Sequence, residues 1–342
     1  MNRSSSPTAS QLGFAYGLAA YGLWGLVPLY FRAVAFVPPF QLLAHRIVWS
    51  LLVLAGLVLL FARGRQLLAC FRSRRLLGLL GVSTVLIALN WFAFIYAVAR
   101  EQVLQTSLGY FITPLVSVAL GIFFLGERLR PAQWVALGMA LAGVLVLIAR
   151  GDGFPWIALT LAFSFGLYGL VRKQAGLDGV VGLSVETLLL FPVALGYLFL
   201  EASRGRLAFA DGDVGLDVLV AASGIVTTVP LLCFAQAVIR LRLTTIGFMQ
   251  YLSPSIAFLL AVLAFGEPFT PAMQACFGLI WAALAVFGWD LARRAEKGEP
   301  PPEASVPSAD AVDGSLRLAP GDVDGSPGID EDVHLAADAE LG

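Results

Sequence analysis

Long apolar stretches alternate with short charged connections along most of the chain. Each stretch holds about 20 residues, the length that an α-helix needs to cross the hydrocarbon core of a bilayer. A backbone in that core has no water to bond, so such stretches must be helical. The pattern therefore predicts an all-α integral membrane protein with ten transmembrane helices. The predicted spans are residues 12–31, 40–61, 76–98, 103–125, 131–149, 154–172, 180–200, 214–238, 244–265 and 272–291.

Composition supports this class and excludes an ordinary soluble enzyme. The 342 residues are 58% hydrophobic and 13% charged, with a mean hydropathy of +0.83, whereas soluble domains carry about a quarter charged residues. From Glu296 onward the chain changes character, with twelve acidic residues against Lys297 and Arg317 among many Pro, Ser, Gly and Ala. Such a segment cannot bury enough apolar surface to fold. We therefore predict that residues 293–342 form a disordered acidic tail in the cytoplasm.

The basic residues of the connections lie mostly on one side of the predicted membrane. Cytoplasmic connections are enriched in Lys and Arg. If the N-terminus is cytoplasmic, fifteen basic residues fall on inner segments and five on outer loops. The sequence therefore predicts that both termini are cytoplasmic, with residues 1–11 forming a short N-terminal segment.

The chain also repeats itself. Residues 90–127 can be laid on residues 230–267 without a gap, and eight of the 38 positions are identical. The segment 20–26 likewise resembles 164–170. The identical pairs include Phe94/Phe234, Ala97/Ala237, Arg100/Arg240, Pro114/Pro254 and Gly126-Glu127/Gly266-Glu267.

The orientation gives this repeat a structural meaning. Each half holds five spans, an odd number, so the second half must enter the membrane upside down. We predict two inverted five-helix repeats, residues 12–149 and 150–292, the construction of many carriers that move about a central site. The alternative is a chance likeness between Gly-rich aromatic helices.

Few polar residues lie within the spans, and polar groups in lipid are costly enough to be functional candidates. His45 and Arg46 lie on the second span, opposite Glu186 on the seventh when the halves are superposed. By helical rise they lie roughly 8 Å below the outer face and Glu186 roughly 9 Å above the inner face, so we expect no direct salt bridge. Our hypothesis is one polar point in the vestibule of each face, with Glu186 also able to carry a coupling proton. The alternatives are snorkelling of Arg46 to headgroups and a structural hydrogen bond of Glu186.

A second set of candidates combines aromatic rings, hydroxyls and an amide, which suit a small amphipathic solute. Three prolines within spans are candidate helix breaks, since each frees a backbone carbonyl that can line a cavity. Ordinary helix packing is the alternative for every one of them. The further substrate-pathway candidates are Asn90, Trp91, Tyr110, Thr113, Thr227, Thr228 and Tyr251; the helix-break candidates are Pro114, Pro230 and Pro254.

Other features favour structure over chemistry. Gly126-Glu127 and Gly266-Glu267 each follow a span and precede a proline, which is typical of a tight turn with a carboxylate near the next helix start. No phosphate-binding Gly-x-x-x-x-Gly-Lys-Ser/Thr motif occurs. The histidines are His45 and His334, so a histidine metal site lacks ligands. We expect no catalytic residue, no metal and no cofactor.

Nine segments of the chain are informative when taken together: Ala20–Phe31, His45–Ser50, Asn90-Trp91, Ser107–Pro114, Leu125–Arg128, Tyr168–Lys173, Glu186–Leu190, Val226–Leu231 and Arg240–Leu243. They resemble the EamA-type ten-span group of the drug/metabolite transporter superfamily. The resemblance runs through about residues 12 to 292.

The resemblance implies a multi-pass protein of the bacterial inner membrane that moves a drug or metabolite by secondary coupling and alternating access. Our interpretation is export of a small organic metabolite or drug, with facilitated diffusion and import left open. A membrane accessory or sensor protein without transport and a passive channel are the alternatives. The expected partners are a small-molecule substrate, a coupling proton and the lipid bilayer; a homodimer is left open, and no nucleic acid is expected.

Overall fold

The computed structural model describes residues 8–100, 102–149, 154–210, 212–264 and 270–296, and the described residues are arranged as helices and short connections. The helices are α1 (Ala9–Ala33), α2 (Pro39–Leu60), α3 (Gly64–Arg72), α4 (Arg74–Ala99), α5 (Val103–Leu125), α6 (Pro131–Ile148), α7 (Trp156–Ala175), α8 (Gly179–Ser203), α9 (Val214–Arg240), α10 (Leu243–Gln250), α11 (Leu252–Leu263) and α12 (Pro271–Glu296).

The all-α class of membrane protein is confirmed. Nine helical stretches in the described part are long and apolar enough to cross a membrane, with α10 and α11 counted together as one. The 20-residue helix α7 covers most of the predicted span 154–172 but is not one of these nine. It carries Arg172 and Lys173 in its last turn, and these two charges lower its hydropathy.

Two features of the helices differ from the expected pattern. The connection after the second span contains α3, a nine-residue helix that buries Cys70. The predicted span 244–265 is divided into α10 and α11 at Tyr251. In addition, α12 continues to Glu296, so the predicted tail begins with helical residues, and its remainder from residue 297 lies outside the described residues.

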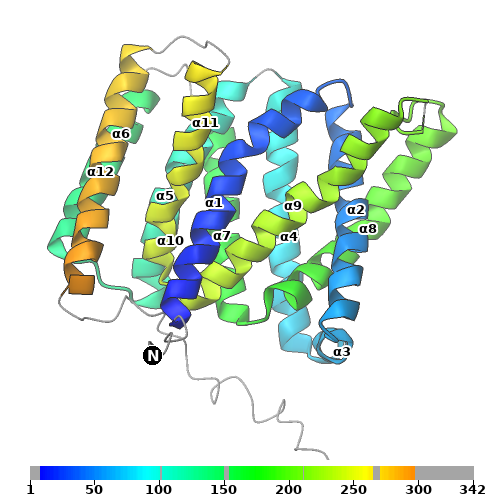
Figure 1. The fold of residues 1–342 in the computed structure, drawn as a ribbon, viewed down its shortest axis with the longest axis horizontal. Helices are drawn as coiled ribbons and strands as arrows, with labels where there is room; N and C mark the ends of the chain where they lie inside the picture. The colour runs from blue at the N-terminus through cyan, green and yellow to red at the C-terminus, as the bar shows by residue number, and fades with distance from the viewer. Residues whose placement is uncertain (1–7, 101, 150–153, 211, 265–269, 297–342) are drawn as a thin grey trace, which may run out of the picture. The chain divides into compact units, whose positions relative to one another are not determined.

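The helices pack in a characteristic set of pairs. Figure 1 shows α6 beside α12 at one edge of the bundle and α2 beside α8 near the other. Between them, α1 packs on α9 and α11, and α7 packs on α4 and α5. The helix α5 packs on α10, α2 on α9, and α4 on α8. Every one of the long helices therefore contacts a partner from the other half of the sequence.

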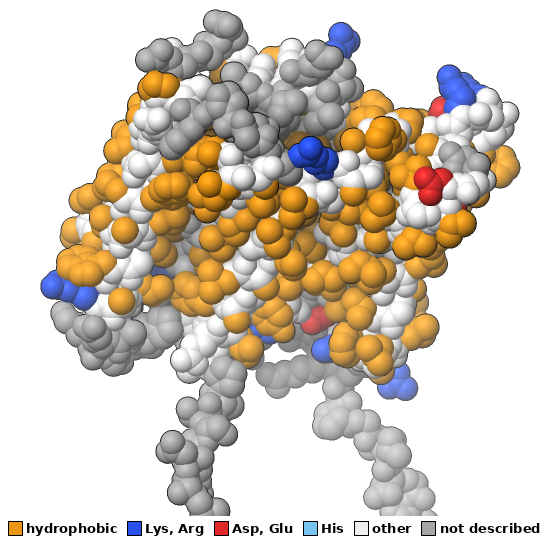
Figure 2. All heavy atoms as spheres, turned by 45° about the horizontal axis from the view of Figure 1, so that its top comes forward, with side chains coloured by type: hydrophobic (Ala, Val, Ile, Leu, Met, Phe, Trp, Pro, Cys, Tyr) orange, Lys and Arg blue, Asp and Glu red, His pale blue; other side chains and the backbone are white. Residues whose placement is uncertain are grey.

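Apolar side chains cover much of one face of this bundle. Figure 2 shows hydrophobic side chains over the middle of one face, with the Lys and Arg side chains at its margins. Large side chains such as Leu59, Phe123 and Phe199 are at least three-quarters exposed. So much exposed apolar surface is typical of contact with lipid. The start of α1 and the end of α12 lie on the same side of the bundle (Figure 1).

Candidate functional site

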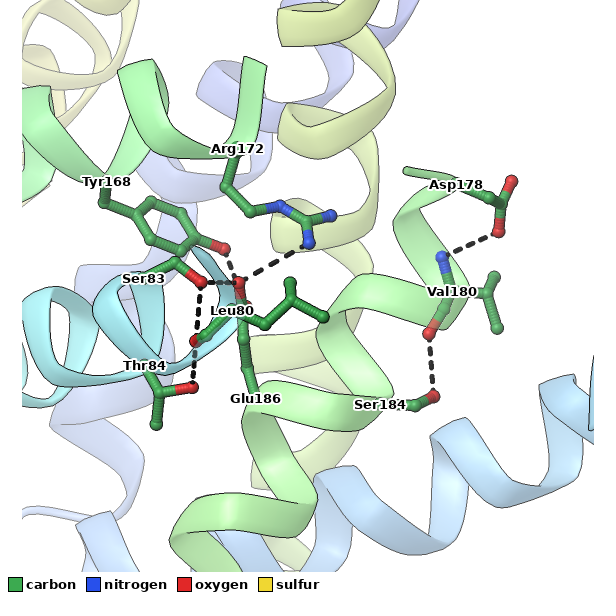
Figure 3. Close-up of polar contacts among 9 residues, drawn as sticks. All are labelled: Leu80, Ser83, Thr84, Tyr168, Arg172, Asp178, Val180, Ser184 and Glu186. Carbon is green, nitrogen blue, oxygen red and sulfur yellow. Dashed lines mark hydrogen bonds and ion pairs between the residues drawn. The ribbon is translucent and has the colours of Figure 1, made fainter. Parts of the chain in front are cut away.

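One polar cluster is built around Glu186 on α8, and its members come from three helices (Figure 3). The Ser83 hydroxyl on α4 donates to Glu186 Oε1 at 2.6 Å, and the Tyr168 hydroxyl on α7 donates to Oε2 at 3.1 Å. Arg172 Nη1, one turn beyond Tyr168, lies 3.4 Å from Glu186 Oε1. All four side chains are buried. The carboxylate therefore joins α4 of the first half to α7 and α8 of the second.

The guanidinium of Arg172 fits closely against backbone. A Cβ added at Gly182 on α8 would lie 1.8 Å from Arg172 Nη1 and 2.7 Å from Cζ. Arg172 is only 2% exposed, and its Nε and Nη2 have no hydrogen-bond partner among the described residues. A buried ion pair of this kind is costly to break, because the remaining charge is left without compensation.

Two further charged side chains hold the connection between α9 and α10. The carboxylate of Glu127 accepts from the backbone N–H groups of Leu243 at 2.7 Å and Thr244 at 2.8 Å. Lys173 Nζ donates to the carbonyls of Val238, at 3.1 Å, and Leu241. An anion thus caps the N-terminus of α10 and a cation caps the C-terminus of α9, as the helix dipoles favour. Three of the segments that carry the family resemblance meet here.

The turn at Gly126 forms as the sequence indicates, but its carboxylate has a different partner. Gly126 has φ +63°, the left-handed conformation that ends α5. Glu127 does not serve the next helix, α6; it caps α10 instead, which begins 116 residues later in the chain. Its repeat counterpart, Glu267, lies outside the described residues.

A second polar point is built around Arg46 on α2. Arg46 Nε donates to Thr227 Oγ1 on α9 at 2.8 Å. The guanidinium carbon lies 5.3 Å from the ring centre of Trp91 on α4 and 5.8 Å from that of Phe31 on α1. Such cation–π distances are favourable. Arg46 therefore contacts side chains of the bundle.

A line of aromatic rings extends from this point. Phe31 packs on Phe94 with 5.9 Å between ring centres, and Phe94 packs on Tyr110 of α5 at 6.4 Å. Tyr110 is 47% exposed. Of the residues proposed from sequence, Arg46, Trp91 and Thr227 are in contact, and Tyr110 joins them through these rings. Phe31 and Phe94 were not among the proposed site residues, although both belong to the repeated or family-like segments.

The other polar candidates are engaged in helix packing. His45 is buried with its ring 5.0 Å from that of Phe209. Asn90 Nδ2 donates to the carbonyl of Leu161, at 2.9 Å, and to Ser164 Oγ, at 3.0 Å, both on α7.

The remaining hydroxyl candidates are also buried. Thr113 Oγ1 donates to the Gly109 carbonyl of its own helix at 2.7 Å, and the Tyr251 hydroxyl donates to the Phe111 carbonyl at 3.3 Å. Thr228 is fully buried, and its hydroxyl has no partner among the described residues. None of these three side chains has a described hydrogen bond to the aromatic residues Phe31, Phe94 and Tyr110.

The three candidate prolines differ in whether their helix is interrupted nearby. The helices α5 and α9 continue through Pro114 and Pro230 without interruption. A proline removes one hydrogen bond of the helix, and neighbouring helices can compensate this within a membrane. The ninth span does divide, but at Tyr251, three residues before Pro254, which lies in the first turn of α11.

The two polar points do not form an ion pair with each other, as expected from the sequence. Glu186 pairs with Arg172, and Arg46 bonds Thr227. Glu186 is 1% exposed, so it is enclosed by its partners in this structure and does not line an open vestibule. Sequence reasoning missed Ser83, Tyr168 and Arg172. Arg172 in particular lies at the end of a span, where the sequence indicates a charge of the following connection.

This architecture defines a polytopic helical membrane protein, and comparison with known proteins assigns its family. The sequence profile of the EamA-like transporter family matches residues 11–149. Protein RarD of Streptomyces exfoliatus is 44% identical over 296 residues, covering 86% of this chain and 94% of that protein. Uncharacterized transporter YojE of Bacillus subtilis is 40% identical over 279 residues, covering 80% and 93%. A crystal structure of a protein with 24% identity matches with a TM-score of 0.62 over 85% of this chain and 100% of that one, which supports the fold.

The chain belongs to the EamA-like transporter family, and within it to the RarD group. It is a multi-pass membrane transporter of this family.

Proposed function

We propose that the protein is a secondary-active transporter that exports a small organic metabolite or drug by alternating access. The observation that carries the proposal is a correspondence between the larger helix contacts of the two halves of the sequence. If each element of residues 12–149 is matched with the element five spans later, every major contact has a counterpart.

The counterparts can be followed pair by pair. The contact of α1 with α9 corresponds to that of α7 with α4, and the contact of α1 with α11 corresponds to that of α7 with α5. The contact of α2 with α9 corresponds to that of α8 with α4. The pairs α2–α8, α5–α10 and α6–α12 map onto themselves. This pattern supports two inverted repeats, 12–149 and 150–292, with α7 as the tenth span.

The aromatic residues of the repeated motif support the same axis. Trp24 on α1 packs edge-on against Phe165 on α7 with 5.7 Å between ring centres. Both rings also pack on Phe234 of α9, at 5.8 Å and 5.1 Å. Equivalent segments of the two halves thus meet at one aromatic cluster. Carriers of this construction move one half against the other around a site between them.

The proposed orientation places both termini in the cytoplasm and the protein in the bacterial inner membrane. The excess of basic residues on the inner segments supports it, as does the position of the start of α1 and the end of α12 on one side (Figure 1).

The Glu186 cluster is the proposed point of coupling to a proton. Protonation of this carboxylate would remove its ion pair with Arg172 and weaken its acceptance from Ser83. Because these contacts hold α4 to α7 and α8, a proton here would loosen one half of the molecule from the other. Buried carboxylates within membrane proteins commonly serve as proton relays.

Reconstitution into liposomes tests the proposal. A panel of labelled amino acids, drugs and metabolites is offered, with protein-free liposomes as the control. Saturable uptake that is accelerated by unlabelled solute on the far side is expected of a carrier. Flux that rises linearly with concentration would indicate a channel, and no flux with any member of a broad panel would favour a sensor or accessory protein.

A further inference from the structure

The charge of Arg46 is not balanced within the part of the chain that the structure describes. Ion pairs among the described residues include those of Arg172 with Glu186 and of Arg204 and Arg206 with Glu201. Arg46 has no carboxylate within ion-pair distance in the described residues. A cation on a membrane-spanning helix without a counter-ion is costly, so such residues usually mark a ligand or ion pathway.

The two terminal nitrogens of Arg46, which form the planar fork of its guanidinium, are available to a ligand. Nε is used by Thr227, and the two terminal nitrogens donate to no described residue. The side chain as a whole is partly exposed. A guanidinium held at Nε presents its terminal N–H groups as a planar pair, which matches the two oxygens of a carboxylate.

The rings beside Arg46 supply the second half of a site. Trp91 and Phe31 flank the guanidinium, and Phe94 continues the line to the half-exposed ring of Tyr110. Apolar rings near one fixed charge are the usual lining of a pocket for a small organic ligand. We propose that Arg46 binds the carboxylate of an organic anion whose apolar or aromatic body lies along Phe31, Phe94 and Tyr110.

This assignment rests on the proposed transport function and deepens it by naming the chemical class of the solute. Arg46 lies on the first half and its hydroxyl partner, Thr227, on the second. A carboxylate bound to the fork would therefore lie where the two proposed halves meet. Phosphate groups of lipids share the anionic chemistry, and the experiment separates the two sources.

Binding is measured calorimetrically on purified protein in nanodiscs of phosphatidylcholine, so that no flux is needed. The probes are matched pairs of carboxylates and their neutral amides: phenylacetate with phenylacetamide, benzoate with benzamide, and indole-3-acetate with its amide. We expect at least one carboxylate to bind and its amide to bind at least about thirtyfold more weakly, since a desolvated, hydrogen-bonded charge pair contributes that much or more.

Variants assign the binding to Arg46. In Arg46→Gln the carboxylate affinity is expected to fall at least about thirtyfold, whereas Arg46→Lys should retain weakened binding because it keeps the charge but not the fork. Arg100→Gln is the matched control: Arg100 is exposed and lies 5.5 Å over the ring of Tyr96. Its affinity should equal that of the wild type. If Arg46→Gln does not fold, the intermediate affinity of Arg46→Lys decides.

Three results would overturn the inference. They are equal binding of carboxylates and amides, unchanged binding in both Arg46 variants, and no binding of any carboxylate by the wild type. Nanodiscs with added phosphatidylglycerol provide the lipid arm: loss of carboxylate binding there would assign the site to lipid phosphate instead. Counterflow with binding unaffected by Arg46 would overturn this inference alone, and Arg46-dependent binding without counterflow would overturn the transport proposal alone.

Discussion

Substitution of Gly182 by alanine tests the buried ion pair with one carbon atom. The new Cβ would lie 1.8 Å from Arg172 Nη1, and real Cβ contacts are essentially never under 3.0 Å, so the guanidinium or the helix must shift. The end of a long side chain usually moves at little cost. Here it is 2% exposed and bound to Glu186, so displacement breaks that contact or forces α8 away from α7.

The substitution Gly182→Ala combines one stabilising effect with two destabilising effects. Alanine in place of glycine within a helix gains about 0.5–1 kcal/mol. Overpacking costs about 1–3 kcal/mol, and full loss of a buried pair costs about 3–5 kcal/mol. With the pair partly lost, the net expectation is a decrease of about 2–4 kcal/mol in the free energy of unfolding.

The assay is reversible unfolding of the purified protein by SDS in mixed micelles, followed by tryptophan fluorescence. The matched control is Gly196→Ala on the same helix, where an added Cβ meets nothing within 4 Å. This control should be unchanged or slightly stabilised. In an Arg172→Ala background the cost of Gly182→Ala should largely disappear, because the clashing atoms are absent. Equal stability of Gly182→Ala and Gly196→Ala would refute the reasoning.

Three further predictions concern helix contacts and coupling. Gly247→Ala on α10 would place a Cβ 2.8 Å from the backbone carbonyl of Pro114 on α5 and should lower stability by about 1–3 kcal/mol in the same assay; Gly278→Ala, with nothing within 4 Å, is its control. Glu127→Gln should cost about 1–3 kcal/mol, because an amide has one acceptor oxygen for the two N–H groups that the carboxylate now accepts; a variant as stable as the wild type would argue against the cap. Glu186→Gln should abolish acceleration of transport by an imposed proton gradient in liposomes, and retained acceleration would exclude this residue as the proton carrier.

The long helices could be predicted from sequence because the thickness of the bilayer fixes their length. Predicted and observed ends of the undivided spans differ by five residues or fewer; for α5, 103–125, they coincide. The helix α3 was missed because it is short and only one of its sides is apolar, so it gives no span-length signal. The division at Tyr251 was not predicted, because Pro254 was the only break signal in the sequence. The helix is interrupted three residues before that proline.

The candidate site was only partly predictable. Polar residues within apolar spans stand out, which identified Arg46 and Glu186. Their partners did not stand out. Arg172 lies in the last turn of α7, where a basic residue is expected to serve the membrane surface, and Glu127 bonds amides more than a hundred residues away. Contacts of this kind depend on how helices pack, which local patterns do not encode.

The inverted arrangement of the two halves is the central claim, and sidedness of labelling tests it most directly. Cys70, Cys233 and Cys276 are replaced by serine, and single cysteines are introduced as Arg100→Cys or Arg240→Cys, equivalent positions of the two repeats. A membrane-impermeant maleimide is applied to intact cells and, separately, to inverted vesicles. We expect labelling at position 100 in cells only and at position 240 in inverted vesicles only. Labelling of both positions from the same side would contradict it.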